Sequence, residues 1–374
     1  MDQRSEAITI TGAYNTAVVF ADQMDTGAEG LLRALCASPI SAGSTIRVMP
    51  DVHAGKGCAI GTTITITDWL APGLVGTDIG CGMTVCRISG RKPELQKLDK
   101  LVQARVPAGR AVRSSPHRLA EQADLEDLRC AKHIRREKAL ASIGTLGGGN
   151  HFVELDQGAD GTYWLIIHTG SRSLGAEVAT YYHERAYSET TPDGIPYELA
   201  VTEGSLMDDY LHDVGIVQEF AELNRRAIAE ELTRGMKLTV EDSFSTVHNY
   251  IDTEQKILRK GAVSARRGER LIIPLNMRDG CLLCIGKGNT DWNQSAPHGA
   301  GRLMSRSEAK QSLTLSQYKK EMAGIYSSSV SRNTIDESPM AYKPTEYVLA
   351  QIAPTADVIE RIKPIYNFKG GEES

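Results

Sequence analysis

Residues 163–175 read YWLIIHTGSRSLG. The first six residues are apolar and rich in β-branched and aromatic side chains, which predicts a strand. The polar turn TGSR follows, and the residues around 176–188 then predict a helix. A strand that ends at His168 and passes through a short turn into a helix is typical of a fold that mixes both kinds of element.

Strands and helices continue to alternate on both sides of this stretch. Strands are expected at 46–50, 58–67, 84–89, 270–275 and 281–286, and helices at 94–105, 117–142, 205–232 and 307–324, before a closing segment of both kinds. The elements follow no regular βαβ period, and no internal repeat or Pro/Ser-rich linker divides the chain. The sequence therefore predicts an α+β fold with a β-sheet core, irregular helices around it and a site built from loops, in one large domain over residues 1–374.

The composition is that of an ordinary globular protein, with 24% charged and 41% hydrophobic residues. The net charge of −5 argues against a protein that coats nucleic acid through bulk positive charge, but not against a local basic groove. The sequence has no signal-peptide pattern and no run of about 18 apolar residues. Its seven cysteines are spread without tight spacing, so we expect a reduced, cytoplasmic protein with no membrane attachment.

Histidines recur where an apolar run meets glycine or a small polar residue. They are His151 in GTLGGGNHFVE, His168 in WLIIHTGSR, His248 in STVHNYI and His298 in APHGAGR. A single histidine at a strand end is more commonly a structural residue, but the repetition favours ligands. Asp78 and Cys81 of GTDIGCGM add a carboxylate and a thiol between glycines that leave the thiolate exposed, and this mixture suits Mn²⁺, Fe²⁺, Co²⁺ or Zn²⁺.

Other candidate residues have a plainer interpretation. Cys281 and Cys284 would lie on opposite faces of one strand and pack in the core. Four more histidines lie in charged, helical stretches and are expected to be solvated or capping: His117, His133, His183 and His212. His53 follows Asp51 at a strand end, where either could orient a ligand.

Charge and glycine patterns give weaker signals. No Walker loop and no GxGxxG fingerprint is present, so neither a P-loop NTPase nor a Rossmann dehydrogenase is supported. Lys56 in GKGCAIG fits a phosphate contact and a solvated turn equally well. Six basic residues flank the loops of His248 and His298 and slightly favour a polyanion groove over a solvated face: Arg259, Lys260, Arg266, Arg267, Arg302 and Arg306.

The motifs, taken in order, resemble those of the RtcB family of RNA ligases over nearly the whole chain. The matching words are MPDVHAGKGCAIGT (49–62), VGTDIGCGM (75–83), GTLGGGNHFVE (144–154), HTGSRSLG (168–175), VHNY (247–250), RKGAVSAR (259–266), HGAGRLMSR (298–306) and DESPMAYK (336–343). Eight words in the same order are a highly specific signal.

The resemblance implies an enzyme that uses GTP and two Mn²⁺ ions to join RNA ends carrying a 2′,3′-cyclic phosphate or 3′-phosphate to 5′-hydroxyl ends, in RNA repair or tRNA splicing. His298 would be the histidine that takes the guanylyl group. The implied metal ligands are Asp78, Cys81, His151, His168 and His248, with Cys81 bridging the ions. The implied nucleotide contacts are Asn150, His151, Glu154, Asn276, His298, Gly299, Ala300, Gly301, Tyr342 and Lys369. An archease-like activator protein would be a further partner.

One word departs from the family pattern. The family usually has Gly-Ser-Met-Gly where this chain has PLNMRDG (274–280), so that Leu275 and Asn276 replace the first two residues. Asn276 would still donate a hydrogen bond to the nucleotide. The departure suggests a divergent paralogue, and it keeps open a metal-dependent RNA cyclic phosphodiesterase or 3′-end processing enzyme that does not seal. A non-enzymatic RNA-binding relative is the third reading.

Overall fold

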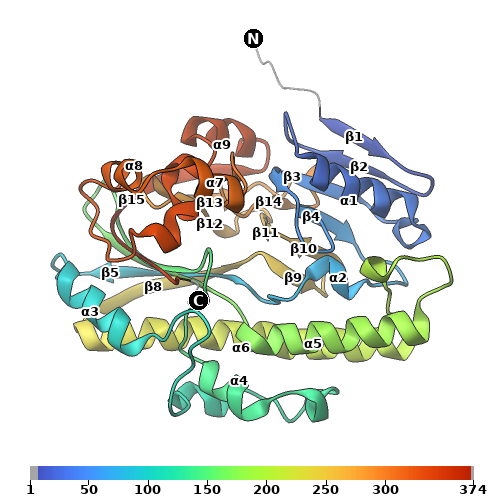
Figure 1. Ribbon diagram of the computed structural model, residues 1–374, viewed down its shortest axis with the longest axis horizontal. Helices are drawn as coiled ribbons and strands as arrows, with labels where there is room; N and C mark the ends of the chain where they lie inside the picture. The colour runs from blue at the N-terminus through green and yellow to red at the C-terminus, as the bar shows by residue number, and fades with distance from the viewer. Residues whose placement is uncertain (1–6, 372–374) are drawn as a thin grey trace.

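The computed structural model describes residues 7–371 and shows a mixed fold of sheets and helices (Figure 1). The strands are β1 (Ile8–Thr11), β2 (Thr16–Val19), β3 (Ile46–His53), β4 (Ile60–Thr65), β5 (Gly82–Ser89), β6 (Phe152–Gln157), β7 (Tyr163–Thr169), β8 (Thr239–Val247), β9 (Asn249–Asp252), β10 (Ile257–Lys260), β11 (Ala262–Ser264), β12 (Arg270–Asn276), β13 (Gly280–Gly286), β14 (Ser295–Pro297) and β15 (Ala356–Lys369). The α-helices are α1 (Thr26–Ala37), α2 (Pro72–Val75), α3 (Leu95–Arg105), α4 (Arg136–Ser142), α5 (Arg172–Arg185), α6 (Gly204–Met236), α7 (Arg306–Ser312), α8 (Leu315–Glu321) and α9 (Thr345–Ile352).

Two larger sheets form the core. The seven-stranded sheet has the order β12-β13-β15-β6-β7-β5-β8, and the six-stranded sheet has the order β1-β2-β3-β4-β10-β9. Strands β11 and β14 pair separately. Among the described strands, β2 and β3 form the parallel pair and the other pairings are antiparallel. This arrangement confirms the predicted α+β class.

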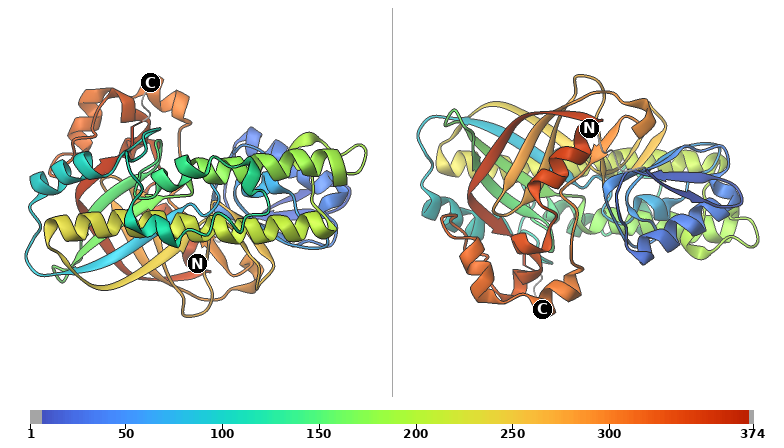
Figure 2. Two further views of the ribbon diagram at one scale, coloured as in Figure 1. Left: turned by 90° about the horizontal axis from the view of Figure 1, so that it is seen from below. Right: turned by 90° about the horizontal axis from the view of Figure 1, so that it is seen from above.

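Helix α6 lies beneath both sheets and runs along most of the molecule, beside α5 (Figures 1 and 2). Its buried residues recur at three- and four-residue steps, as the sequence predicts for 205–232. Leu206, Tyr210 and Val214 pack in the core around the six-stranded sheet, whereas Ile228 and Leu232 pack in the core of the seven-stranded sheet. The helix therefore joins the two cores.

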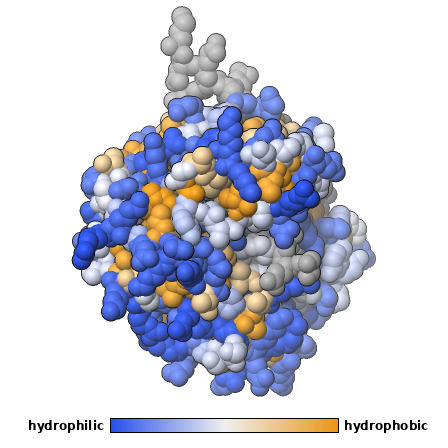
Figure 3. All heavy atoms as spheres, turned by 60° about the vertical axis from the view of Figure 1, so that its left-hand side comes forward, coloured by the Kyte–Doolittle hydropathy of each residue, from blue (hydrophilic) through white to orange (hydrophobic). Residues whose placement is uncertain are grey.

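Most predicted elements are present with shifted ends. The strands expected at 46–50, 84–89 and 163–168 are β3, β5 and β7, each longer than predicted by one to three residues. The helix expected near 176–188 begins four residues earlier, at Arg172. None of the helices in the described range is both long and apolar enough to cross a membrane. On the face in Figure 3, hydrophobic residues form small patches within a hydrophilic surface.

The predicted helix at 117–142 is wrong. Residues 118–122 and 131–133 form short 3₁₀ turns, and only Arg136–Ser142 is α-helical. Buried Asp213 of α6 accepts hydrogen bonds from the backbone N–H groups of Arg129 (2.8 Å) and Cys130 (3.0 Å). The segment is thus fixed against α6 by a side chain instead of by its own helical hydrogen bonds.

The predicted helix at 307–324 is two helices, α7 and α8. Thr314 separates them, because its hydroxyl accepts a hydrogen bond from the backbone of Gln317 while the Gln317 side chain accepts from the backbone of Thr314. This capping box starts a new helix within a stretch whose composition favours helix throughout.

Candidate metal centre and adjoining pocket

Four neighbouring strands bring the expected metal ligands to one end of the seven-stranded sheet. Cys81 directly precedes β5, His151 directly precedes β6, His168 lies near the end of β7, and His248 directly follows β8. In the sheet, β7 pairs with both β5 and β6, so that His168 lies opposite Met83 and Phe152. Because β5 also pairs with β8, the four side chains are brought together although they are far apart in the sequence.

The ligand atoms of these residues converge. Cys81 Sγ lies 3.3 Å from His151 Nε2 and 3.4 Å from His168 Nε2. His168 Nε2 is 3.4 Å from His248 Nε2, and His151 Nε2 is 3.1 Å from Asp78 Oδ2. The sequence-predicted set is therefore brought together, with Cys81 in the middle. Cys81 itself is buried, so the expectation of an exposed thiol is wrong.

The chemistry of these groups fits a bound cation. Burial holds the pKa of both His168 and His248 well below the usual value, so each imidazole is neutral and offers a lone pair. Burial opposes ionisation of Asp78, but its hydrogen bond with His151 and the charge of that histidine lower its pKa to about 2. Burial and the Asp78 charge raise the pKa of the Cys81 thiol, so a cation is what would let it ionise.

His298 lies next to this cluster on the loop after β14. Its Nδ1 is 2.6 Å from Asp51 Oδ2, and its backbone N–H donates to the same oxygen at 3.1 Å. The Asp51 side chain, on β3, is 1% exposed. The His298 ring lies 5.0 Å from the His248 ring between centroids. Asp51 of the six-stranded sheet therefore anchors a histidine from another segment beside the metal ligands of the seven-stranded sheet.

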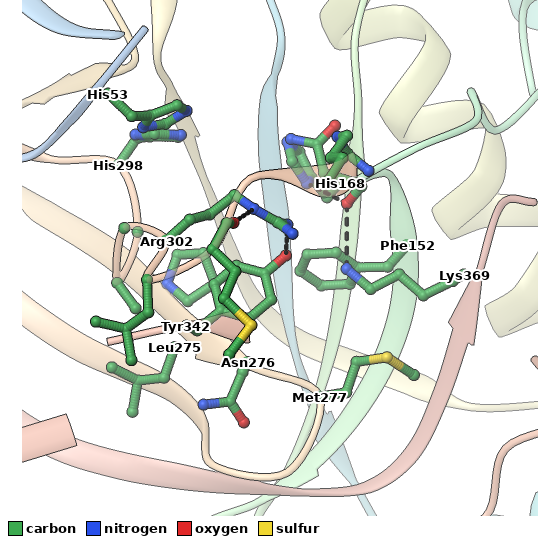
Figure 4. Close-up of a pocket in the computed structure, with 18 of the residues that line it drawn as sticks. His53, Phe152, His168, Leu275, Asn276, Met277, His298, Arg302, Tyr342 and Lys369 are labelled. Carbon is green, nitrogen blue, oxygen red and sulfur yellow. Dashed lines mark hydrogen bonds between the residues drawn. The ribbon is translucent and has the colours of Figure 1, made fainter. Parts of the chain in front are cut away.

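His53 accompanies His298 at the edge of the adjoining pocket (Figure 4). Its Nδ1 donates to the backbone oxygen of Asp51 at 2.9 Å. The two candidates for orienting a ligand thus differ, because the Asp51 carboxylate contacts His298 directly, whereas the His53 ring hydrogen-bonds to the backbone oxygen of Asp51.

A pocket of about 580 Å³ opens beside the cluster (Figure 4), a size that suits a nucleotide-sized ligand. All the expected nucleotide contacts except His151 line it: Asn150, Glu154, Asn276, His298, Gly299, Ala300, Gly301, Tyr342 and Lys369. His168 lines both the pocket and the ligand cluster. The two sites that the sequence predicts separately are therefore adjacent.

Glu337, which was not among the predicted site residues, organises the cationic side of this pocket. It forms ion pairs with Lys369 (3.0 Å), Arg306 (2.8 Å) and Arg302 (3.6 Å), and accepts a hydrogen bond from the Tyr342 hydroxyl at 2.7 Å. The signal was available, because Glu337 belongs to the same word, DESPMAYK, that supplied Tyr342.

Replacing Glu337 by glutamine is expected to destabilise the fold in a pH-dependent way. Burial opposes its ionisation, but Lys369 and Arg306 hold its pKa at about 2, below 4.5 for an unperturbed glutamate. This difference corresponds to roughly 3 kcal/mol of stability that is present above pH 4.5 and lost as the pH falls towards 2. Urea denaturation should show the gap between wild type and Glu337→Gln narrowing below pH 4.5. Glu308→Gln, at an exposed position, is the control. A difference in unfolding free energy between wild type and Glu337→Gln that is the same at all pH values would contradict the prediction.

The amide of Asn276 is engaged in the hairpin between β12 and β13. Its oxygen accepts from the backbone N–H groups of Arg278 (3.0 Å) and Asp279 (2.9 Å), and its Nδ2 donates to Asp279 Oδ2 at 2.8 Å. Leu275, which is 2% exposed, also lines the pocket. Asn276 therefore shapes the turn with its oxygen and one amide N–H, and its contact with a nucleotide stays a prediction.

A second group of buried side chains that could hold a metal ion includes Glu154, which lines the pocket. Glu154, Asp156 and Cys281 are buried, with their ligand atoms within 4.8 Å of one another. Asn367 donates to Glu154, and burial raises the pKa of both carboxyls. Cys281 and Cys284 belong to different hydrophobic clusters, which confirms that they lie on opposite faces of their strand.

The predicted basic groove is wrong for its first part. Arg259 is fully buried and pairs with Asp252 (3.4 Å), and Lys260 donates to the backbone oxygen of Val75 at 2.9 Å. Arg266 also pairs with Asp252. These three side chains are thus engaged by partners within the protein, which a count of basic residues does not reveal. Arg302 and Arg306 do line the pocket.

Lys56 and the remaining histidines lie away from both sites. His117 is buried, accepts a hydrogen bond from the backbone of Leu119 and lies 3.4 Å from Glu231, so it caps but is not solvated. Lys56 lines a separate cavity of about 250 Å³ together with His183.

A carboxylate, a thiol and three imidazoles beside a nucleotide-sized pocket define the class of a candidate metal-dependent enzyme. The family model described as tRNA-splicing ligase RtcB matches residues 35–129 and 117–370, and the chain belongs to this family of RNA ligases. It is 33% identical over 369 residues to the RNA-splicing ligase RtcB of Escherichia coli K12, covering 87% of this chain and 90% of that protein. It is 30% identical over 427 residues to the tRNA-splicing ligase RtcB of Aeropyrum pernix, covering 86% and 87%.

Proposed function

We propose that the protein is a GTP- and Mn²⁺-dependent RNA ligase that joins 2′,3′-cyclic phosphate or 3′-phosphate ends to 5′-hydroxyl ends, in RNA repair or tRNA splicing. Family membership supports the RNA ligase class. The observation that carries the finer proposal is the Asp51–His298 pair, which lies between the ligand cluster and a nucleotide-sized pocket. The cytoplasm, tRNA or rRNA fragments as substrates and an archease-like activator belong to the same proposal.

The Asp51 contact prepares His298 as a nucleophile. Because the carboxylate accepts a hydrogen bond, Nδ1 carries a proton, and in the neutral imidazole it is Nε2 that has the lone pair for attack. Nε2 attacks the α-phosphorus of GTP, a P–N bond forms, and the bond to the leaving pyrophosphate breaks. An oxygen of the RNA 3′-phosphate then displaces His298 from the guanylyl group. Finally the 5′-hydroxyl attacks the RNA phosphorus, loses its proton to water, and releases GMP.

The ligand cluster suits two ions. One ion would be held by Asp78, Cys81 and His151, and the other by Cys81, His168 and His248. Cys81 would serve both because its Sγ lies close to His151 Nε2 and to His168 Nε2. When bound, the ions would supply positive charge on both sides of the phosphoryl displacement. The protein side chains would hold this charge next to the pocket at whose edge His298 lies.

Two residues that line the pocket support guanine as the base of the nucleotide. Glu154 is an acceptor for N–H groups, and Lys369 is a donor whose Nζ lies 3.0 Å from Glu337 and 4.8 Å from the Phe152 ring centroid. Guanine presents N–H donors next to a carbonyl acceptor, so this acceptor and donor pair matches one edge of the base. Tyr342 contributes an aromatic surface to the same pocket (Figure 4).

Two assays on the intact protein test the proposal. Incubation with [α-³²P]GTP and Mn²⁺ should label the protein, and RNA with a cyclic phosphate and a 5′-hydroxyl should be sealed.

Leu275 in the pocket and the engaged Asn276 amide favour the second candidate, an RNA end-processing enzyme that does not seal. Conversion of the cyclic phosphate end without a sealed product at saturating GTP would establish that alternative. If the protein neither seals RNA nor converts the cyclic end, both candidate functions are rejected.

Asp51→Asn is expected to slow labelling by GTP roughly 100-fold, because it removes the negative charge that fixes and supports the His298 imidazole. Rapid-quench labelling at saturating GTP measures the rate, and equilibrium binding of GTP should change little. Asp68→Asn, at an exposed position, is the matched control. An unchanged labelling rate in Asp51→Asn would remove Asp51 from the mechanism.

A further inference from the structure

A fully buried arginine of α6 lies directly beneath the ligand cluster. Arg225 Nη1 donates to the backbone oxygens of Gly80 (2.7 Å) and Thr169 (3.0 Å). Gly80 immediately precedes Cys81, and Thr169 immediately follows His168. One guanidinium nitrogen therefore connects the two backbone segments that carry the central thiol and the histidine 3.4 Å from it.

The neighbouring residue connects a third segment. Asn224 Oδ1 accepts from the backbone N–H groups of Gly144 (2.8 Å) and Thr145 (3.0 Å), at the start of the glycine-rich stretch that leads to His151. Its Nδ2 donates to the oxygen of Gly170 at 2.9 Å. A side chain on Gly170 would collide with the Asp78 carboxylate, so this glycine also lies against the cluster.

The same face of α6 reaches the remaining ligand segment. Gln218 lies seven residues, about two turns, before Arg225 and accepts a hydrogen bond from Ile251 N–H at 2.8 Å, on the strand that follows His248. Ala221, between them, packs against Gly80, where an added Cβ would lie 2.7 Å from the Ala221 Cβ. All four ligand-bearing segments are thus in contact with one helix.

Stability alone is a poor explanation for this arginine. Its Nη2 pairs with Glu222 at 2.8 Å, but its Nε has no hydrogen-bond partner in the described residues. Burying a guanidinium that is not fully satisfied is costly, and an apolar side chain of similar volume is commonly as stable or more stable. The position therefore retains a group that costs stability and contacts two ligand loops.

We propose that Arg225, assisted by Asn224, is a positioning residue of the metal centre. It sets the separation of Cys81 and His168 by holding the carbonyl groups beside them, so that the thiol and the imidazole can reach the same ion. The inference rests on the metal centre proposed above and concerns how its geometry is maintained.

Mn²⁺ binding by intact variants tests the inference, using electron paramagnetic resonance to measure free Mn²⁺. Arg225→Met should bind Mn²⁺ roughly 10- to 100-fold more weakly than wild type, as is typical when a group that supports ligands is lost. Arg225→Lys keeps the charge but cannot span both carbonyls in the same way, so it should show a smaller loss. Arg226→Met, at the adjacent exposed position, should bind as wild type does.

A Co²⁺ titration adds a readout that general destabilisation would not move. The thiolate-to-Co²⁺ absorption band should weaken in both Arg225 variants while circular dichroism without metal stays the same. If wild type binds Mn²⁺ and both Arg225 variants bind it with the same affinity, this inference alone is overturned. If wild type binds no Mn²⁺, the proposed metal centre itself is overturned. If neither variant folds, Arg225 is a residue of the fold and the inference is equally overturned.

Discussion

His298→Ala should abolish covalent labelling of the protein by [α-³²P]GTP. In the structure His298 is anchored through Nδ1 to Asp51, and its ring is adjacent to the ligand cluster at the edge of the pocket. Alanine cannot form the P–N bond, so the loss should be complete, below the detection limit of a gel that resolves about 0.1% of wild-type labelling (roughly 4 kcal/mol). GTP binding measured without turnover should persist, because most of the pocket is unchanged.

His212→Ala is the matched control for this result. His212 is a partly exposed residue of α6 that pairs with Asp127. It is not among the residues that line the pocket. Labelling that survives in His298→Ala and is lost in another histidine variant would assign the nucleophile elsewhere, with His53 the first candidate because it lines the same edge.

Cys81→Ala should remove Mn²⁺ binding and, with it, labelling. Cys81 Sγ lies within 3.4 Å of His151 and His168, so one substitution removes a ligand atom from both proposed ion positions. We expect Mn²⁺ affinity to fall by more than about 100-fold, beyond the effect of losing a supporting group. Metal analysis after dialysis measures the bound ions, and His298 labelling should disappear in the same preparation.

Cys86→Ala provides the control, since Cys86 is also buried and lies on β5 but packs in a hydrophobic cluster away from the ligands. Two ions retained by Cys81→Ala would show that the thiol is not a ligand. One ion retained would show that Cys81 serves a single position and does not bridge.

The ligand residues could be predicted from sequence because a local pattern marks each of them. His151, His168 and His248 each lie where a strand meets a turn, and a strand end is identifiable from apolar runs and glycine. Their convergence could not be derived from spacing, since it depends on β7 pairing with β5 and β6, and on β5 pairing with β8. The resemblance to the RtcB family supplied that link.

The errors have a common physical origin in tertiary contacts. The charged composition of 117–142 suits a helix, but Asp213 captures the backbone of Arg129 and Cys130 and holds it in another shape. Arg259 was predicted to belong to a basic groove, but it is buried and pairs with Asp252, which its sequence neighbours do not indicate. Glu337 and Arg225 were missed for the same reason, because what marks them is burial among partners from distant segments.

The position of β15 has a consequence for how the protein is made. This strand, residues 356–369, lies between β13 and β6 in the middle of the seven-stranded sheet. During synthesis on the ribosome, more than 350 residues must emerge before this interior strand is available, so β6 and β13 each keep an unpaired edge until then. Nascent chains released before this point should be captured by chaperones, and the pocket wall that carries Lys369 should not form until β15 is inserted.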